Sequence, residues 1–157
     1  MEDQLLLKSS MIIIGRKDKA DFPELGLYDI DAKVDTGAYT SAIHCHDIME
    51  VDGVGARKVR FRLLDPSRPS YNNMELIHSI YAKREIKNSF GQVEERYIIK
   101  TKVLLFDRLF DTELSLTDRS RMVYPVLLGR KLLFNHFIVD VRQTDLSYNQ
   151  KLRGMKK

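Results

Sequence analysis

The sequence predicts an all-β fold whose strands form a closed or nearly closed barrel, which would hide the edges of the sheet. Three observations lead to this prediction. Apolar and polar residues alternate over several stretches of the 157 residues, as in half-buried strands. Turn-forming residues separate these stretches. Only residues 130–134 have the character of a helix, and it is a short one.

The alternating stretches follow one another along most of the chain. The first has Tyr28, Ile30, Ala32 and Val34 on its apolar side and Asp29, Asp31, Lys33 and Asp35 on its polar side. The apolar sides of the next three are Val59, Phe61 and Leu63; Tyr97, Ile99, Thr101, Val103 and Leu105; and Phe110, Thr112, Leu114 and Leu116. We expect a hairpin loop at 88–91, a tighter one at Asp107 and Arg108, and a longer, proline-containing loop at 64–73.

Length and composition indicate a single soluble domain over residues 1–157. The chain is 43% hydrophobic and 31% charged, and its longest apolar runs, such as residues 11–14, are too short to cross a bilayer. Cys45 is the only cysteine, which excludes an internal disulfide. The first ten residues lack the basic region of a signal peptide. We therefore expect a cytoplasmic protein without membrane contact.

The net charge of +4 is mild, but basic residues cluster in two places. Arg57, Lys58, Arg60 and Arg62 alternate with apolar residues on one predicted strand, and residues 149–157 form a basic tail. A solvated edge strand and a frayed terminus would explain both. The alternative is a surface for an anionic partner, either nucleic acid or an acidic peptide.

Asp35, Thr36 and Gly37 end the first alternating stretch, with Asp35 on its polar side. One interpretation is a tight turn in which Gly37 takes a positive φ. The other is the loop of an aspartic peptidase, in which the aspartate activates water for attack on a peptide carbonyl. That chemistry needs two neighbouring carboxylates that share one proton. Since the chain holds no second Asp-Thr-Gly or Asp-Ser-Gly, the second carboxylate must come from another copy, and we expect a homodimer.

A second segment supports the peptidase interpretation. Residues 125–130, Pro-Val-Leu-Leu-Gly-Arg, form a short apolar stretch about ninety residues after the Asp35 loop. In retroviral-type aspartic peptidases a similar apolar stretch ending in glycine passes beside the catalytic loop. A side chain at Gly129 would block such a close approach of two backbones. A buried strand ending in a turn would explain the stretch equally well on its own.

The chain resembles a whole family over roughly residues 12–148. This is the bacterial retropepsin-like aspartic peptidase family found beside RimK-type glutamate ligases, whose members are labelled ATP-dependent zinc proteases. The matching segments are Gly15-Arg16, Leu25-Gly26, Ala32 to Ala38, Thr40 to His44, Val59 to Phe61, Ser89 to Gly91, Glu95 to Tyr97, Leu116 to Arg119, Met122, Pro125 to Arg130, and Val139-Asp140.

The resemblance implies a retropepsin-like fold and peptide-bond hydrolysis. It implies in particular the removal of glutamates that the ligase adds to the tail of a ribosomal protein. Asp35 would then be the catalytic acid and base, with Thr36 and Gly37 shaping its loop. The resemblance also makes Lys33, His44, Arg96 and Arg130 candidate substrate-binding residues. Acidic tails would be the substrates, and a RimK-type ligase or the ribosome would be partners.

The family labels zinc and ATP find no support in the residues. The chain has no phosphate-binding Gly-x4-Gly-Lys-Ser/Thr and no His-Glu-x-x-His. On a strand, His44 and His46 would face one side and Cys45 the other, so His78 or His136 would have to complete a metal site. We therefore expect no cofactor and no metal, and we expect Cys45 to be a small core residue.

Two questions stay open at this stage. Lys33 lies two residues before Asp35 on the same side of the strand, where its charge would oppose a shared proton on Asp35. Lys33 could pair with Asp31 or Asp29, bind substrate carboxylates, or be solvated. The second question is whether the chain is an enzyme at all. A non-catalytic module that binds ribosome, RNA or acidic peptides is the alternative, although such a module would not require Asp-Thr-Gly.

Overall fold

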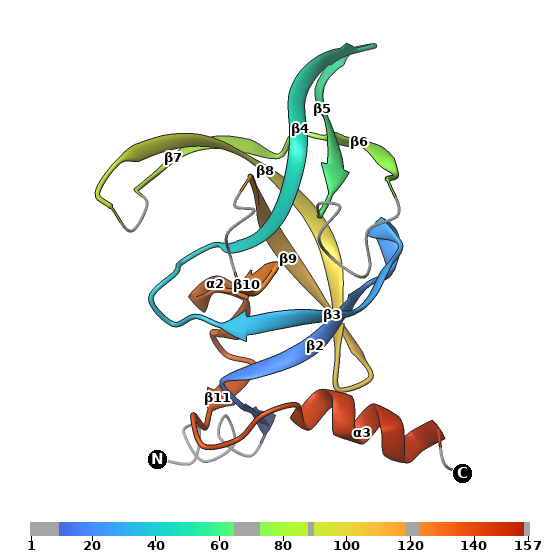
Figure 1. The fold of residues 1–157 in the computed structure, drawn as a ribbon, viewed down its shortest axis with the longest axis vertical. Helices are drawn as coiled ribbons and strands as arrows, with labels where there is room; N and C mark the ends of the chain where they lie inside the picture. Colours follow the sequence, from blue (N-terminus) through green and yellow to red (C-terminus); the bar gives the residue numbers. More distant parts are fainter. Residues whose placement is uncertain (1–9, 65–72, 88–89, 119–122, 156–157) are drawn as a thin grey trace.

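The computed structural model describes residues 10–64, 73–87, 90–118 and 123–155, and within them strands predominate (Figure 1). The strands are β1 Ile12–Ile14, β2 Lys17–Phe22, β3 Leu27–Val34, β4 Ser41–Gly53, β5 Ala56–Leu63, β6 Glu75–Ser79, β7 Ala82–Lys87, β8 Val93–Leu105, β9 Arg108–Thr117, β10 Val126–Leu128 and β11 Phe137–Val139. The helical elements are η1 Pro23–Leu25, α2 Arg130–Leu133 and α3 Leu146–Met155. The predicted all-β class is confirmed.

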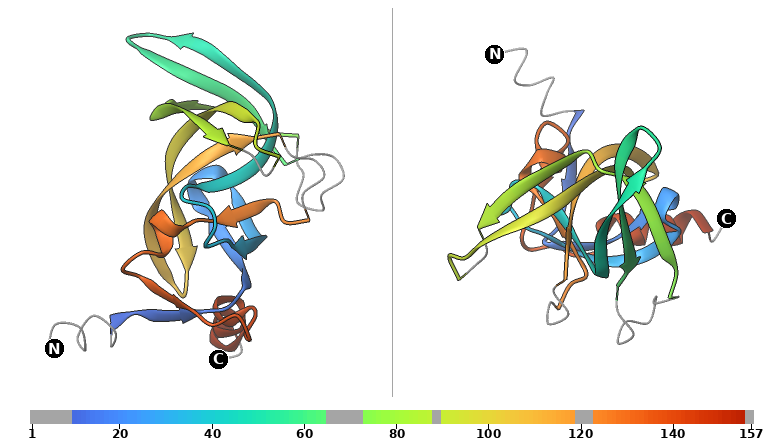
Figure 2. Two further views of the ribbon diagram at one scale, coloured as in Figure 1. Left: turned by 90° about the vertical axis from the view of Figure 1, so that its left-hand side faces the viewer. Right: turned by 90° about the horizontal axis from the view of Figure 1, so that it is seen from above.

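Six of the strands close into a ring through their pairing. The order is β10-β3-β2-β8-β9-β4, and β4 pairs back with β10. The β4–β5 hairpin projects from this ring with β6 beside β5, while β7 pairs with β8 (Figure 2). β1 and β11 form a separate two-stranded parallel sheet. This ring is the closure of the sheet that the sequence predicts.

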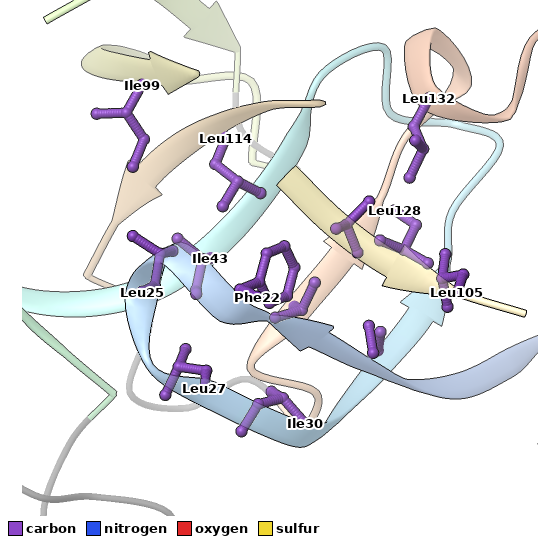
Figure 3. Packing of buried hydrophobic residues seen from close by; sticks show 14 of the residues in the cluster. Phe22, Leu25, Leu27, Ile30, Ile43, Ile99, Leu105, Leu114, Leu128 and Leu132 are labelled. Carbon is purple, nitrogen blue, oxygen red and sulfur yellow. The ribbon is translucent and has the colours of Figure 1, made fainter. Parts of the chain in front are cut away.

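The apolar core fills the ring (Figure 3). Its largest fully buried side chains come from strands far apart in the sequence, among them Phe22, Ile43, Ile99, Leu114 and Leu128. The inward sides predicted for β8 and β9 are confirmed from Ile99 onward, since their alternate residues are buried. Burial of such side chains is the dominant favourable contribution to folding.

The prediction for Tyr28 is wrong, because its side chain is 57% exposed. Asp29, the next residue, has a φ of 53°, and the pairing of β2 with β3 shifts between Ala20 and Phe22. An irregularity of this kind reverses which side of a strand faces the core. Ile30, Ala32 and Val34 are buried as predicted.

The basic strand β5 is not an edge strand, so that prediction is also wrong. β5 pairs with β4 on one side and with β6 on the other. Its arginines contact carboxylates: Arg62 lies 3.2 Å from Glu75, and Arg57 lies 3.4 Å from Glu50. Much of the charge on this surface is therefore balanced within the chain, which weakens the case for nucleic acid as its partner.

The two predicted hairpins are present. β7 and β8 are paired up to Lys87 and Val93, although residues 88 and 89 of the loop lie outside the described residues. The tighter turn consists of Phe106 and Asp107, one position earlier than predicted. Both have a positive φ, as expected for a two-residue hairpin turn that follows the twist of the strands. Most of the predicted loop at 64–73 and Arg119 and Met122 of the family pattern also lie outside the described residues.

Helix α2 confirms the short helix predicted at 130–134, ending one residue earlier. Helix α3 was not predicted, and the expectation of a frayed terminus there is wrong. Its first turn is held by a residue from β2: the Asp18 carboxylate accepts hydrogen bonds from the amides of Ser147 (2.8 Å) and Tyr148 (3.1 Å). Lys151 adds ion pairs to Asp21 and Asp29. The helix lacks a strong apolar stripe, so its stability depends on these distant partners.

Among the described residues, the helices are all shorter or more polar than a membrane-crossing helix requires.

Candidate active site

The Asp35 loop, residues 35–40, connects β3 to β4 and passes over the end of β10. β10 runs parallel to β3 and antiparallel to β4, so it lies between the two strands that carry the loop. The amide of Asp35 donates to the carbonyl of Leu128 at 2.9 Å. The prediction that the apolar stretch after residue 125 lies beside Asp35 is confirmed.

Gly37 brings its backbone close to the Asp35 side chain. Its amide donates to Asp35 Oδ1 at 3.0 Å, and a Cβ added at Gly37 would lie 3.2 Å from the same oxygen. The positive φ considered for Gly37 is not found, because the described glycines with positive φ are Gly26, Gly55 and Gly91. The hydrogen bond orients the carboxylate.

Gly129 has the role that the sequence predicts. A Cβ at this position would lie 2.8 Å from the backbone of Thr40 and 2.8 Å from the carbonyl oxygen of Tyr39. The Gly129 amide donates to Ser41 Oγ at 2.9 Å, which ties the start of β4 to the end of β10. A larger residue would push the Asp35 loop away from β10.

The first residues of α2 hold the loop from the other side. The amides of Arg130 and Lys131 donate to the carbonyls of Ala38 (2.8 Å) and Tyr39 (3.0 Å). The Arg130 guanidinium donates to the Thr36 carbonyl at 2.9 Å and lies over the Tyr39 ring. Arg130 therefore fixes the Asp35 loop itself, through a contact that the sequence does not reveal.

The Asp35 carboxylate faces a groove of about 690 Å³, which we call the Asp35 groove. Its lining residues are Asp35, Gly37, Ala38, Tyr39, Thr40, Ala42, Arg84, Glu85, Ile86, Lys87, Arg96, Leu127 and Lys131. These residues come from the Asp35 loop, β4, β10 and α2, and from β7 with Arg96 of β8. A groove of this size accommodates several residues of an extended peptide.

The structure brings most of the predicted site residues together. Asp35, Gly37 and Arg96 line the groove, and Arg130 contacts Thr36 at its edge. Arg96 is largely buried and pairs with Glu94 at 2.9 Å. His44 does not line the groove, and its side chain has no exposed surface.

Lys33 is exposed and lies on β3, outside the residues that line the groove. The two aspartates considered as its partners are engaged elsewhere: Asp31 pairs with Lys19, and Asp29 with Lys151. Within the described part of the chain, no carboxylate pairs with Lys33. Its ammonium group is thus available to a ligand or to solvent.

The His44 to Asp47 segment shows no arrangement for a metal. Among the described residues, no three His, Cys, Asp or Glu side chains are grouped so that they could hold an ion. His46 Nδ1 lies 2.5 Å from the Leu64 carbonyl oxygen. Cys45 is fully buried, and burial raises the pKa of its thiol to about 12, so it is an unreactive core residue.

Sequence reasoning missed three cations of the groove: Arg84 and Lys87 of β7, and Lys131 of α2. β7 reads Ala-Lys-Arg-Glu-Ile-Lys, which lacks the alternation that identifies the other strands. The excess of basic residues in that segment is the one feature that could have drawn attention to it.

The comparisons with known proteins agree with this geometry. A family model described as the RimB-like family, retropepsin-like aspartic endopeptidase RimB, matches residues 13–150. The resemblance predicted over 12–148 is therefore confirmed. A Legionella pneumophila protein of unknown function has a similar crystal structure, with a TM-score of 0.71 and 26% identity over 86% of this chain and 97% of that one.

Three curated relatives are named probable alpha-L-glutamate ligase. Those of Shewanella halifaxensis and Desulfotalea psychrophila are each 36% identical, over 85% and 82% of this chain, and that of Parasynechococcus marenigrum is 32% identical over 82%. The matches cover 28–29% of those proteins. The chain thus spans less than a third of the length of the curated relatives it matches.

Proposed function

The chain belongs to the RimB-like family of retropepsin-like aspartic endopeptidases, and we propose that it hydrolyses peptide bonds as a homodimer with one Asp35 from each copy. Family membership supports a peptidase-type activity. The observation that carries the assignment of Asp35 is its carboxylate, oriented by the Gly37 amide and facing a peptide-sized groove.

The proposed reaction needs two carboxylates of different protonation. One Asp35, ionised, removes a proton from a water molecule, whose oxygen attacks the peptide carbonyl carbon. The other Asp35, protonated, donates a hydrogen bond to the carbonyl oxygen. Collapse of the tetrahedral intermediate breaks the C–N bond, and the Asp35 that took the proton from water gives it to the nitrogen of the leaving amine. Because each chain supplies one Asp-Thr-Gly, a two-fold axis has to bring the two loops together.

We propose acidic peptide tails, in particular glutamate-rich tails such as those made on a ribosomal protein, as the substrates. Four cations line or border the groove: Arg84, Lys87, Arg96 and Lys131. The unpaired Lys33 adds a fifth near the same loop. Positive potential in a cleft attracts anionic substrates. The names of the curated relatives support a functional connection to a glutamate ligase, which we propose as a partner.

Subunit mixing tests the shared site. Asp35→Asn keeps the size of the side chain but removes the base, so the variant alone should not cleave an acidic peptide. After exchange of equal amounts of wild-type and variant chains, about a quarter of the dimers would be fully wild-type. Activity per wild-type chain should then fall to about half.

Circular dichroism and the melting temperature provide the control for folding of the Asp35→Asn variant. Full activity per wild-type chain, with subunit exchange confirmed, would show that one Asp35 acts without the other and would contradict the proposal. Retention of activity by the variant itself would exclude Asp35 as the catalytic residue.

A further inference from the structure

We infer that Arg84 and Lys131, held by the buried carboxylate of Glu113, form a subsite that binds a carboxylate side chain of the substrate. This inference rests on the proposed function, because it assigns a specificity to the same groove. It concerns residues that come from three separate elements, β7, β9 and α2.

The three side chains meet at one point. Glu113 of β9 is 6% exposed, and its Oε1 accepts a hydrogen bond from Arg84 Nη2 at 3.0 Å. Its Oε2 contacts Lys131 Nζ. Both cations line the Asp35 groove, Arg84 from β7 and Lys131 from α2.

The charges of this cluster do not cancel. Two cations share one carboxylate, which leaves one positive charge on the groove wall. Arg84 and Lys131 have 36% and 44% of their side chains exposed, so both can contact a ligand. An arginine has five N–H donors and a lysine three, and Glu113 occupies only some of them. A second carboxylate, from the substrate, could accept hydrogen bonds from both.

The cluster is also fixed relative to the catalytic loop. The Lys131 amide donates to the Tyr39 carbonyl at 3.0 Å, so the lysine is anchored to the loop that begins at Asp35. Buried Glu113 prevents Arg84 and Lys131 from collapsing onto other partners, which reduces the ordering required when a ligand binds. A peptide in the groove would therefore place an acidic side chain here while its backbone passes Asp35.

A binding experiment tests the subsite separately from catalysis. In the Asp35→Asn background, fluorescence anisotropy would measure the Kd of a labelled oligoglutamate peptide and of its oligoglutamine counterpart. Arg84→Gln and Lys131→Gln should each weaken binding of the glutamate peptide about tenfold. Neither should change binding of the glutamine peptide more than about twofold. Each substitution leaves Glu113 with one cation, which limits the cost to folding.

Lys83→Gln is the matched control, because Lys83 neighbours Arg84 on β7 but pairs with Glu95 and does not line the groove. It should leave the Kd of both peptides unchanged. Arg84→Lys keeps the charge and should restore part of the preference for glutamate. The inference is wrong if Arg84→Gln and Lys131→Gln leave the preference for the glutamate peptide intact, or if they weaken binding of both peptides equally.

The two proposals fail in distinguishable ways. Loss of the glutamate preference on substitution of Arg84 or Lys131, in a protein without Asp35-dependent hydrolysis, would support the subsite and overturn the proposed reaction. Asp35-dependent hydrolysis that is equally fast for glutamate and glutamine peptides, in the wild type and in Arg84→Gln, would overturn the subsite alone.

Discussion

The Asp35 loop and helix α3 are attached to the same ring of strands by different kinds of contact. Most of the contacts that hold the loop are backbone hydrogen bonds. The Asp35 amide donates to the Leu128 carbonyl of β10, and the amides at the start of α2 donate to the carbonyls of Ala38 and Tyr39. Side chains hold α3, through the Asp18 carboxylate and the ion pairs of Lys151. The backbone contacts of the loop are sensitive to added bulk, whereas a helix held by charges responds to pH, salt and single substitutions.

Two glycine substitutions give the largest expected contrast between these regions. Gly129→Ala should lower the free energy of unfolding by about 3 kcal/mol and abolish peptide hydrolysis, because the new methyl group meets the backbone of Thr40 and Tyr39. Chemical denaturation and a peptidase assay would measure both effects.

Gly154→Ala in α3 is the matched control for Gly129→Ala. A Cβ at Gly154 has no atom within 4 Å. The substitution should stabilise α3 by about 0.5–1 kcal/mol, because alanine favours a helix over glycine. Equal effects of the two substitutions would contradict the contrast between the two regions.

Removal of the side chain that caps α3 should have an intermediate effect. Asp18→Ala leaves the amides of Ser147 and Tyr148 without their acceptor, so we expect a loss of about 1–2 kcal/mol of stability. Hydrogen exchange should increase in residues 146–155 and stay unchanged in the Asp35 loop. Asp111→Ala, at an exposed ion pair with Lys102, should leave the stability almost unchanged. Increased exchange in the Asp35 loop on Asp18→Ala would show that the two regions are coupled.

A smaller effect should appear in the pH dependence of stability. Burial raises the pKa of Asp18 above its ordinary value of 3.8, although the amides of Ser147, Lys19 and Tyr148 oppose the shift. The folded protein therefore holds this proton more tightly than the unfolded chain. The contribution of Asp18 to the free energy of unfolding should decrease as the pH rises from 3.8 through the raised value.

Comparison with Asp18→Asn isolates this contribution, since the amide does not titrate. The stability of the wild type relative to that variant should decline with rising pH in this interval. Asp140→Asn should give the opposite slope, because Arg142 lowers the pKa of Asp140, and the stabilisation by its ionised form is lost as the pH falls. A rising curve for Asp18 would contradict the assignment.

Added salt should produce the smallest difference between α3 and the Asp35 loop. Raising the ionic strength from 0.1 to 1 M shortens the screening length from about 10 Å to about 3 Å. Hydrogen exchange in α3 should then increase by about twofold, because the partly exposed pairs of Lys151 weaken. The amides of Asp35 and Lys131 should keep their exchange rates, since their acceptors are uncharged carbonyls. Faster exchange at Asp35 than in α3 on addition of salt would contradict this expectation.

The sequence by itself determined the features that depend on neighbouring residues. Alternation predicted the buried sides of β5, β8 and β9, and the order of Asp-Thr-Gly and Leu-Leu-Gly predicted the peptidase family. The role of Gly129 followed from the need for two backbones to approach closely. These predictions succeeded because periodicity and glycine requirements are local properties of a chain.

Contacts between distant segments decided the rest. Tyr28 faces outward because the pairing of β2 with β3 shifts, and α3 forms because Asp18, 129 residues before Ser147, caps it. Glu113 contacts both Arg84, 29 residues before it, and Lys131, 18 residues after it, although none of the three stands out in the sequence. Such contacts depend on which strands become neighbours when the ring closes, and a linear pattern does not contain that information.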